Sequence, residues 1–462
     1  MYLVAGLGTT GQSVLRYFDA QGEPCLAFDT RDSLDISALQ AEFHHIEFSL
    51  GEVPNGWLSR FETIVLSPGI AKSEPWVESL IKLGKQVIGD IELFARTVSV
   101  PVIAITGSNG KSTVTTMTGM ALHEAGYSVG IGGNIGTPVL DLILDKNDYD
   151  VYVLELSSFQ LETTYSLETV SATILNISED HMDRYMDLEA YIQAKTKVFA
   201  NTEHAVIPEG FSTEGLIHHA EISHFGLGEK VIQSEHDYGL IPVSKSGGKQ
   251  LWLGRGKTPM VAVSEMKLQG THHQLNALAM MALCQSFTVS TADFTRVVSS
   301  FSGLPHRTQS VGCYEGVEWV NDSKGTNVGA TLTAIQSLGC QIEGSLILIL
   351  GGVSKEADFS ELEPSVKAFC RHTILFGRDK NRIAESLIES EMTLVDDIAE
   401  AVNVAKEQAS SGDCVLFSPA CASFDQFANY MQRGDIFMEL VESLYASEEA
   451  SITLPKHNKA NS

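Results

Sequence analysis

Residues 105–113 read ITGSNGKST, directly after the apolar run at 102–104, and they open a helical pattern that extends to about residue 124. A strand that turns on glycines into a helix forms a cradle for phosphate, because Gly107 and Gly110 can adopt backbone angles at which successive N–H groups face one anion. The helix N-terminus adds partial positive charge. Lys111 can reach the terminal phosphates, and the hydroxyl of Ser112 can ligate Mg²⁺. The motif therefore favours nucleotide binding over an ordinary glycine turn.

The composition is typical of a folded protein with ample core. The chain has 462 residues, 44% of them hydrophobic and 19% charged, which suits about three domains. The net charge of −27 argues against nucleic acid as a partner, because such a surface needs clustered Lys and Arg. Seven cysteines without a C-x-x-C pair favour reduced thiols in a cytoplasmic protein. We expect no membrane insertion, since no signal-peptide pattern opens the chain and no apolar run approaches the ~20 residues of a membrane span.

The N-terminal turn carries a second phosphate-binding signal. An expected strand at 3–5 leads into G-x-G-x-x-G, formed by Gly6, Gly8 and Gly11. A second strand at 25–28 ends at Asp29, followed closely by Arg31. This pattern is typical of a dinucleotide fingerprint and would indicate NAD, but any ligand with a pyrophosphate could use the same turn, and Arg31 suits a phosphate.

A domain boundary falls near residue 92. A further strand at 63–66 ends in SPGIA at 67–71, a loop at the sheet edge where ligands normally bind. A helical connector is expected at 90–96, and the strand pattern restarts after it. We therefore assign residues 1–92 to the first domain.

Two strands near the phosphate loop end in polar residues. The apolar strand at 151–156 contains Glu155, and a carboxylate in a strand buried on both faces is costly unless it binds a cation. Glu155 is thus a candidate Mg²⁺ ligand, the alternative being a carboxylate paired with a buried base. The strand at 172–175 precedes NISEDHMDR at 176–184, which we interpret as an active-site loop containing His181.

The rest of the central domain gives weaker signals. We expect a glycine-rich turn at 129–136, short alternating runs without an assigned function at 205–268, and a helix at 270–287. Lys195 lies in another expected helix, and the pattern alone makes it a solvated surface lysine.

The third domain follows a linker at 302–305 and repeats the α/β rhythm. Arg307, just after the linker, could move with this domain and reach a nucleotide held by the second. Strands at 317–320, 346–350 and 415–417 end in NDSKGTN, GGVSK and SPACAS. Hydroxyls, lysines and N–H groups on one edge predict a site for a small molecule with carboxylates. The tail at 447–462 is polar, and we expect it to be loose.

The predicted fold is α/β with three domains: a Rossmann-like one at 1–92, a central P-loop ATPase-like one with a mostly parallel sheet at 93–302, and a Rossmann-like one at 303–446. Two phosphate turns and one basic edge call for two phosphorylated ligands and an acidic third. ATP with magnesium could phosphorylate a carboxylate, and an amine could attack the acyl phosphate, with positioning and charge neutralisation supplying most of the catalysis.

Seven motifs together resemble those of the Mur ligases: ITGSNGKST, LELSSFQLE, NISEDHMDRY, GLPHR, NDSKGTN, GGVSKEADF and SPACASFDQF. They span nearly the whole chain in the family's order. The resemblance implies three domains that bind a UDP-sugar, ATP and an amino acid in turn, so that the first turn holds UDP. Within the family, the motifs most resemble those of ligases that add D-glutamate to UDP-N-acetylmuramoyl-L-alanine in peptidoglycan synthesis. We expect the protein to be a monomer.

The resemblance also implies roles for single residues. The expected ATP contacts are Gly107, Asn109, Gly110, Lys111, Ser112, Thr113, Asn276, Arg307 and Asp322. The expected UDP-substrate contacts are Thr9, Thr10, Thr30, Arg31, Ser67, Pro68, Gly69, Asn134 and Gln160. The expected D-glutamate contacts are Asp180, Thr326, Lys355, Ser423 and Tyr430, with Lys324 as an electrostatic stabiliser.

Two magnesium ions are implied in the same way, one held by Ser112 and Glu155 and the other by His181 and Lys195. The family carries a carbamate on the lysine at the place of Lys195, which turns a cation into a metal-binding carboxylate. Carbamate formation requires a neutral amine, so the site must lower the pKa of the Lys195 amine from its usual ~10.4.

The sequence departs from the family pattern at three positions. Gly325 stands where alanine is common, a change that should loosen the loop without altering the chemistry. His273 stands where asparagine is usual, which affects one adenine contact, and Tyr430 stands where phenylalanine is usual.

The alternatives are another Mur ligase or a folylpolyglutamate-type synthase, a nicotinamide-dependent dehydrogenase fused to an ATPase, and a non-catalytic nucleotide-binding regulator.

Overall fold

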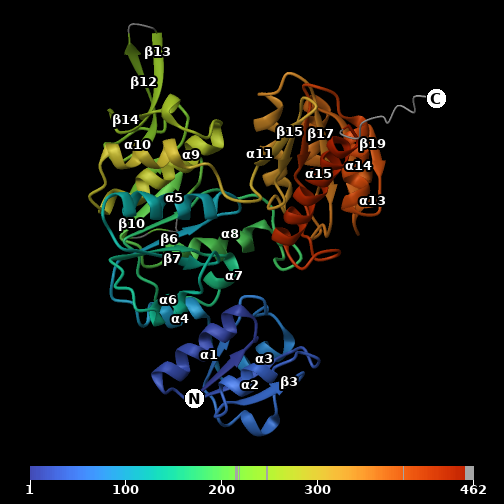
Figure 1. Ribbon diagram of the computed structural model, residues 1–462. Helices are drawn as coiled ribbons and strands as arrows, with labels where there is room; N and C mark the ends of the chain where they lie inside the picture. Colours follow the sequence, from blue (N-terminus) through green and yellow to red (C-terminus); the bar gives the residue numbers. More distant parts are fainter. Residues whose placement is uncertain (214–216, 218, 246–247, 389, 453–462) are drawn as a thin grey trace, which may run out of the picture. The chain divides into compact units, whose positions relative to one another are not determined.

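The computed structural model describes residues 1–213, 217, 219–245, 248–388 and 390–452 (Figure 1). The chain forms two compact units, the first made of residues 1–177 with 187–301 and the second of residues 178–186 with 302 onward. The loop at 178–186 thus packs with the C-terminal part of the chain.

The first unit begins with a parallel sheet in the order β3-β2-β1-β4-β5. Its strands are β1 (Tyr2–Ala5), β2 (Cys25–Asp29), β3 (Glu47–Leu50), β4 (Thr63–Leu66) and β5 (Gln86–Ile88), and its helices are α1 (Thr9–Gln21), α2 (Ser37–Glu42) and α3 (Pro75–Lys82). Alternate residues of β1 serve opposite faces, since Val4 packs with Val14 of α1 whereas Leu3 packs with Val77 of α3. The strand order reverses between β2 and β4 around β1, which places the turn after β1 at the switch point where ligands bind.

The second sheet of this unit runs in the order β14-β13-β12-β11-β10-β9-β6-β8-β7. Its strands are β6 (Val102–Thr106), β7 (Val129–Gly133), β8 (Val151–Glu155), β9 (Ser171–Ile174), β10 (His204–Pro208), β11 (Glu221–Phe225), β12 (Tyr238–Lys245), β13 (Gly248–Arg255) and β14 (Thr258–Ala262). Pairing is parallel from β7 to β12, and β12, β13 and β14 are antiparallel. The short alternating runs expected at 205–268 are therefore largely strands.

The helices of this part are α4 (Asp90–Ala95), α5 (Lys111–Glu124), α6 (Val139–Leu144), α7 (Ser158–Leu161), α8 (Leu188–Thr196), α9 (Thr271–Leu283) and α10 (Thr291–Ser300). Helix α5 has the bounds that the sequence predicts. In Figure 1, α9 and α10 lie beside α5 on one face of the sheet. This arrangement brings the start of α9 to the phosphate loop.

The glycine-rich turn expected at 129–136 is wrong for residues 129–133, which form strand β7 along β8. Its glycines permit close packing, because a Cβ at Gly130 would lie 2.5 Å from the Tyr152 ring and one at Gly133 would lie 2.2 Å from the Glu155 carbonyl oxygen. At Gly130 and Gly133 the missing side chain permits the close approach of β8, and Gly133 also has a φ of +100°. The sequence pattern does not distinguish these glycines from those of a turn.

The second unit contains one mixed sheet in the order β15-β16-β20-β17-β18-β19, in which only the described pair β15–β16 is antiparallel. Its strands are β15 (Gln309–Tyr314), β16 (Val317–Asn321), β17 (Leu346–Gly351), β18 (Cys370–Phe376), β19 (Met392–Leu394) and β20 (Cys414–Phe417). Its helices are α11 (Val328–Gly339), α12 (Glu363–Phe369), α13 (Lys380–Ser386), α14 (Ile398–Gln408) and α15 (Tyr430–Ile452).

Helices cover both faces of this sheet. Leu348 of β17 packs with Ile335 of α11, whereas Ile347 packs with Val402 of α14 and Phe437 of α15. The prediction of a loose tail at 447–462 is wrong for its first residues, because α15 continues to Ile452. Residues 453–462 lie outside the described part. In the part of the chain that the structure describes, no helix is both long and apolar enough to cross a membrane.

Candidate functional site

The phosphate loop joins β6 to α5, and its two glycines take conformations that other residues rarely adopt. The φ angle is +143° at Gly107 and +84° at Gly110, the residue before α5. The ammonium of Lys111 donates to the carbonyl oxygens of Gly107 and Ser108, at 2.8 Å each. A cation held by neutral carbonyls can transfer to a phosphate oxygen, because a charged acceptor forms the stronger hydrogen bond.

Asn176 fixes the same loop, although sequence analysis gave it no role. The Asn109 N–H donates to Asn176 Oδ1 at 2.8 Å, and Asn176 Nδ2 donates to the Asn109 carbonyl at 3.0 Å. Its sequence signals were its position as the first polar residue after β9 and its place in the active-site loop predicted at 176–184.

Lys195 is buried, so the surface position that the helical pattern suggests is wrong. Its side chain is among the most buried in the described part of the chain, its Nζ donates to Gly107 O at 2.9 Å, and it lies 4.6 Å from the Tyr191 ring centroid. The Tyr191 hydroxyl in turn lies 3.2 Å from Ser108 Oγ. Lys195 and Tyr191 are four residues apart on α8 and therefore share the face that packs on the phosphate loop.

Glu155 ends β8 beside the phosphate-loop strand, with Ile105 of β6 as its register partner. It is 2% exposed and accepts a hydrogen bond from Asn134 Nδ2 at 2.8 Å. Ser112, in the first turn of α5, is also buried. A carboxylate and a hydroxyl are oxygen ligands of the kind that Mg²⁺ prefers, so this donor set fits the ion.

Gln160 and Asn276 also lie in this part of the first unit. Gln160 is buried in α7, where its side chain completes a capping box with Ser157. Asn276 of α9 lies against the phosphate loop, since a Cβ at Gly110 would be 2.9 Å from its Oδ1. One turn earlier, the rings of His272 and His273 are 3.9 Å apart, and burial together with the charge of His272 lowers the pKa of His273 to about 3. At neutral pH His273 is therefore an uncharged ring.

The N-terminal turn packs against the loop after β4. Gly6 has a φ of +94°, and a Cβ there would lie 2.6 Å from Ser67 Cβ. Thr9 and Thr10 open α1. The structure thus brings the first turn together with the loop of Ser67, Pro68 and Gly69.

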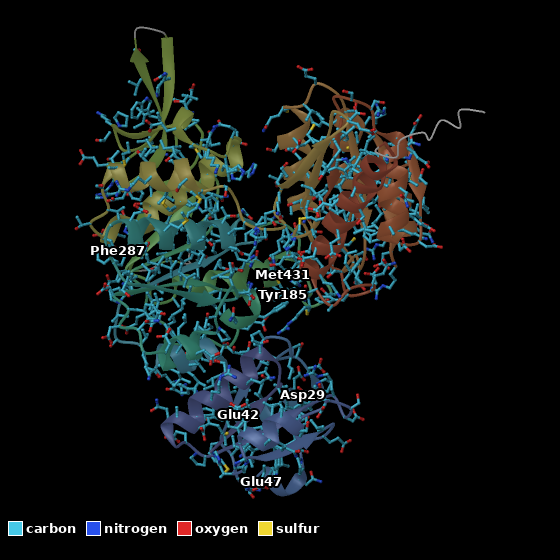
Figure 2. All side chains as sticks on the ribbon, viewed as in Figure 1. Asp29, Glu42, Glu47, Tyr185, Phe287 and Met431 are labelled. Atoms are coloured by element: carbon cyan, nitrogen blue, oxygen red, sulfur yellow. The ribbon has the colours of Figure 1, made fainter. Side chains whose placement is uncertain are left out.

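The carboxylate of Asp29, a residue labelled in Figure 2, forms its hydrogen bonds within the protein. It accepts four hydrogen bonds, one from the Leu7 N–H at 2.8 Å and three from the backbone N–H, Nε and Nη2 of Arg31. Burial alone would raise the pKa of Asp29, but these hydrogen bonds outweigh it and lower the pKa to about 2. Four bonds use the lone pairs of a carboxylate, so Asp29 has no acceptor left for ribose hydroxyls, which speaks against NAD.

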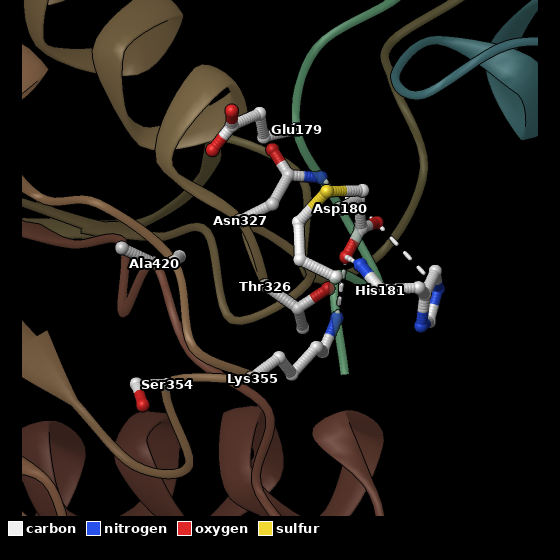
Figure 3. Close-up of a pocket in the computed structure, with 10 residues that line it drawn as sticks. Glu179, Asp180, His181, Thr326, Asn327, Ser354, Lys355 and Ala420 are labelled. Carbon is white, nitrogen blue, oxygen red and sulfur yellow. Dashed lines mark hydrogen bonds and ion pairs between the residues drawn. The ribbon is translucent and has the colours of Figure 1, made fainter. Parts of the chain in front are cut away.

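A small, partly open cavity lies within the second unit (Figure 3). Its lining residues come from the loop at 178–186 and from the loops that follow β16, β17 and β20: Glu179, Asp180, His181, Met182, Thr326, Asn327, Ser354, Lys355, Ala357 and Ala420. At its centre, Lys355 Nζ is 2.7 Å from Asp180 Oδ1, and Asn327 Nδ2 donates to Asp180 Oδ2 at 3.2 Å. The strand ends that the sequence predicts to share an edge do meet here.

Three non-glycine residues of this cavity have left-handed backbones: His181 at φ +60°, Lys355 at +51° and Ala420 at +57°. Such conformations cost roughly 1–2 kcal/mol each and persist where the surrounding structure fixes them, often at functional sites.

Other expected residues of the second unit do not line this cavity. Lys324 Nζ lies 4.0 Å from the Tyr430 ring centroid, and Ser423 is buried. Asp322 is buried, which raises its pKa to about 6, although the charge of Arg307 acts in the opposite direction.

No role was predicted for Arg433, because a lone arginine in the first turn of a helix gives no sequence signal. It is fully buried and donates to Ser323 O at 2.7 Å, Ser323 Oγ at 3.0 Å and Cys421 O at 3.0 Å. It therefore ties the loop after β16 to the loop after β20. His181 belongs to the second unit and Lys195 to the first, so their joint role at a second magnesium ion remains a prediction.

Comparison with protein families gives three matches along the chain: "Mur ligase MurD-like, N-terminal domain" over residues 1–89, "Mur ligase middle domain" over 105–284, and "Mur ligase, glutamate ligase domain" over 306–421. The chain is 58% identical to a protein of Hydrogenovibrio crunogenus, over 97% of this chain and 99% of that one, and 42% identical to one of Legionella pneumophila, over 96% and 99%. Both relatives are named "UDP-N-acetylmuramoylalanine--D-glutamate ligase".

Solved structures agree on the fold. MurC of Thermotoga maritima has a TM-score of 0.60 at 17% identity and covers 96% of this chain and 99% of its own. MurF of the same organism, in complex with ADP, has a TM-score of 0.60 at 17% identity and covers 97% and 95%. The predicted α/β fold of three domains is confirmed, and with relatives this similar over nearly its whole length, the chain belongs to the Mur ligase family.

Proposed function

We propose that this protein is an ATP-dependent ligase that joins D-glutamate to UDP-N-acetylmuramoyl-L-alanine through an acyl phosphate, in the synthesis of peptidoglycan precursors. The observation that carries this conclusion is the 58% identity, over nearly the full length, to a relative named for that reaction. Because its substrates are ATP and a nucleotide-activated sugar, we place the reaction in the cytoplasm.

The first half-reaction transfers the γ-phosphoryl group of ATP to the carboxylate of the UDP-sugar peptide. The N–H groups of the loop between Gly107 and Lys111 bind the phosphates, and the Lys111 ammonium moves from its carbonyl partners to them. Ser112 and Glu155 would hold a Mg²⁺ that neutralises charge on the transferred group. We further propose that Lys195 carries a carbamate, which would give the phosphate loop a second metal-binding carboxylate.

In the second half-reaction the neutral amine of D-glutamate attacks the acyl carbon. A C–N bond forms, the C–O bond to phosphate breaks, and the proton lost by the amine is taken up by the released phosphate. Lys355 and Thr326 at the cavity bind the side-chain carboxylate, and Ser423 binds the α-carboxylate. The Lys355–Asp180 pair supports this proposal, because it presents a carboxylate in hydrogen-bonding contact with that lysine.

UDP binds at the first turn of the chain. Two features support this position: the contact between Gly6 and Ser67 at the switch point of the sheet, and the exposed guanidinium of Arg31 beside it. The engagement of Asp29 with Arg31 and Leu7 favours a UDP-sugar over NAD.

Phosphate release from ATP and Mg²⁺ with UDP-N-acetylmuramoyl-L-alanine tests the proposal. D-glutamate is compared with L-glutamate, glycine and diaminopimelate. We expect release that depends on D-glutamate alone. Release with a different amino acid would overturn the substrate, and ATP binding without any amino-acid-dependent release would point to a regulator.

A further inference from the structure

Two loops of the second unit leave the sheet side by side, carrying Asp322 and Ser418. Strands β16 and β20 are parallel neighbours with Asn321 opposite Phe417, and the Asp322 N–H donates to Phe417 O at 2.8 Å. The next residue of each strand therefore occupies the same level at the carboxyl edge of the sheet.

A chain of hydrogen bonds from Ser418 and Thr331 fixes the Asp322 carboxylate. Ser418 Oγ donates to Asp322 Oδ2 at 2.6 Å and lies 2.9 Å from Thr331 Oγ1 on α11. Because a hydroxyl has one hydrogen and Ser418 uses it on the carboxylate, its oxygen can only accept from Thr331. The Thr331 hydroxyl also lies 3.1 Å from the carbonyl oxygen of Ser418. Whether it donates to this carbonyl or to the Ser418 hydroxyl, its partner is Ser418.

Two further contacts define the position of the carboxylate. The Thr308 N–H donates to Asp322 Oδ1 at 3.0 Å. The backbone of Gly325 passes so close that a Cβ there would lie 2.6 Å from Asp322 Oδ2 and 2.7 Å from Ser418 Oγ. Gly325 is therefore tightly packed. We expected glycine at this position to loosen the loop, and the structure instead shows close contacts around it. Ser418 and Thr331 are both fully buried, so water does not replace these bonds.

We propose that Ser418, supported by Thr331, is a positioning residue that holds the Asp322 carboxylate ionised and in one orientation for binding the nucleotide. This inference rests on the proposed function and on the ATP contact that the family resemblance implies for Asp322, and Ser418 has no role in either. Ser418 acts through Asp322 and does not itself touch substrate.

Electrostatics gives the inference a measurable signature. Burial raises the pKa of Asp322 to about 6, while the Ser418 hydroxyl, the Thr308 N–H and the charges of Arg307 and Arg433 lower it. Removing the Ser418 hydroxyl deletes the first of these lowering effects. The pKa of Asp322 then rises further, so a larger fraction of the carboxyl group is protonated near neutral pH.

The kinetic test compares Ser418→Ala with two variants of Thr331. We expect Ser418→Ala to raise the KM for ATP about tenfold and the KM for D-glutamate less than twofold, with part of the ATP loss recovered at pH 8.5. Thr331→Val keeps the shape and loses the hydroxyl, so it should shift the KM for ATP in the same direction, whereas Thr331→Ser should behave as the unmodified protein. Thr333→Val is the matched control, because Thr333 lies on the same helix and, among the residues that the structure describes, its hydroxyl bonds to the helix backbone at Gly329.

A second test does not depend on catalysis. Asp322 has a folded-state pKa above its ordinary value of 3.8, so its contribution to stability declines as pH rises from about 4 to about 6 and is constant above. If Ser418→Ala raises that pKa, the Tm difference from the unmodified protein should grow between pH 6 and 8, and it should stop growing when Asp322→Asn is added.

These results separate the inference from the function on which it rests. Absence of D-glutamate-dependent phosphate release in the unmodified protein would reject the proposed function alone. Equal rises of the KM for ATP and for D-glutamate, or a Tm difference that does not change with pH, would overturn the positioning role of Ser418.

Discussion

Replacement of Lys355 by methionine tests the centre of the cavity. Methionine keeps the length of the side chain and removes only the charge and its hydrogen bonds. Both residues pay the same backbone cost at φ +51°, so strain cancels in the comparison. The experiment therefore isolates the ammonium that lies 2.7 Å from Asp180.

The geometry sets the expected size of the effect. The side chains of Lys355 and Asp180 are 14% and 10% exposed, so their ion pair is only weakly screened by solvent. A charge-assisted hydrogen bond of this kind is worth about 1.5–3 kcal/mol. If the lysine makes the same bond to the side-chain carboxylate of D-glutamate, the KM for D-glutamate should rise about 10- to 100-fold, at about 1.4 kcal/mol per decade.

Stability should fall as well, because Asp180 loses a partner. The Asn327 amide and the His181 N–H still donate to its oxygens, so we expect a loss of about 2 kcal/mol and no global unfolding. Urea denaturation measures this loss, and phosphate release at varied D-glutamate and at varied ATP measures the two KM values.

Lys380→Met is the matched control. Lys380 Nζ also lies 2.7 Å from a carboxylate, that of Asp396, but the Asp396 side chain is 89% exposed and the pair lies away from the cavity. The KM of the Lys380→Met variant for D-glutamate should equal that of the unmodified protein. An unchanged KM for D-glutamate in Lys355→Met, or an equal rise of the KM for ATP, would contradict the binding of the D-glutamate carboxylate by Lys355.

Further predictions concern the first unit. Glu155→Ala should abolish metal-dependent turnover while circular dichroism and Tm stay normal, and full activity at saturating Mg²⁺ would remove Glu155 from the metal site. Lys195→Ala should abolish activity, and partial rescue by added short carboxylic acids would support the carbamate, whereas rescue by amines would contradict it. Glu92 is 2% exposed and accepts hydrogen bonds from Arg96 and from the loop after α7. Glu92→Gln should therefore lower the free energy of unfolding, measured by urea denaturation, by about 2–4 kcal/mol. A loss under about 1 kcal/mol would show that these bonds are dispensable. Asp29, with a pKa lowered to about 2 from 3.8, contributes stability above pH 4 that is lost as pH falls towards 2; Asp29→Asn should remove this slope from the Tm, and an unchanged slope would assign it to other groups.

Local sequence rules located the strands that lead into the predicted sites, and the loops at the ends of those strands. Apolar runs bounded by glycine and polar residues indicated β4 at Thr63–Leu66 and helix α5 at Lys111–Glu124 with their observed bounds. These rules work because a parallel strand buried on both faces must be apolar, and because a phosphate turn needs glycine at particular positions. The motifs also indicated the family, since each one reports the backbone that its ligand requires.

Where a residue's role depends on distant neighbours, the same rules failed. The run VGIGG at 129–133 looks like a turn, and only pairing with β8 makes it a strand. Lys195 looks like a surface lysine until α8 packs on the phosphate loop. The polar residues after 446 gave no sign that α15 continues, because a helix docked at its first turns can extend through a polar stretch.

The sequence by itself determined the α/β architecture, the phosphate loop and the strand ends that carry polar residues, because these follow from local propensity and from the period of apolar residues. Only the tertiary structure decided that Asp180 meets Lys355, 175 positions later in the chain, and that Ser418 holds Asp322. The physical reason is that ion pairing and burial depend on groups brought together through space by strand order, and a local pattern contains no information about those neighbours.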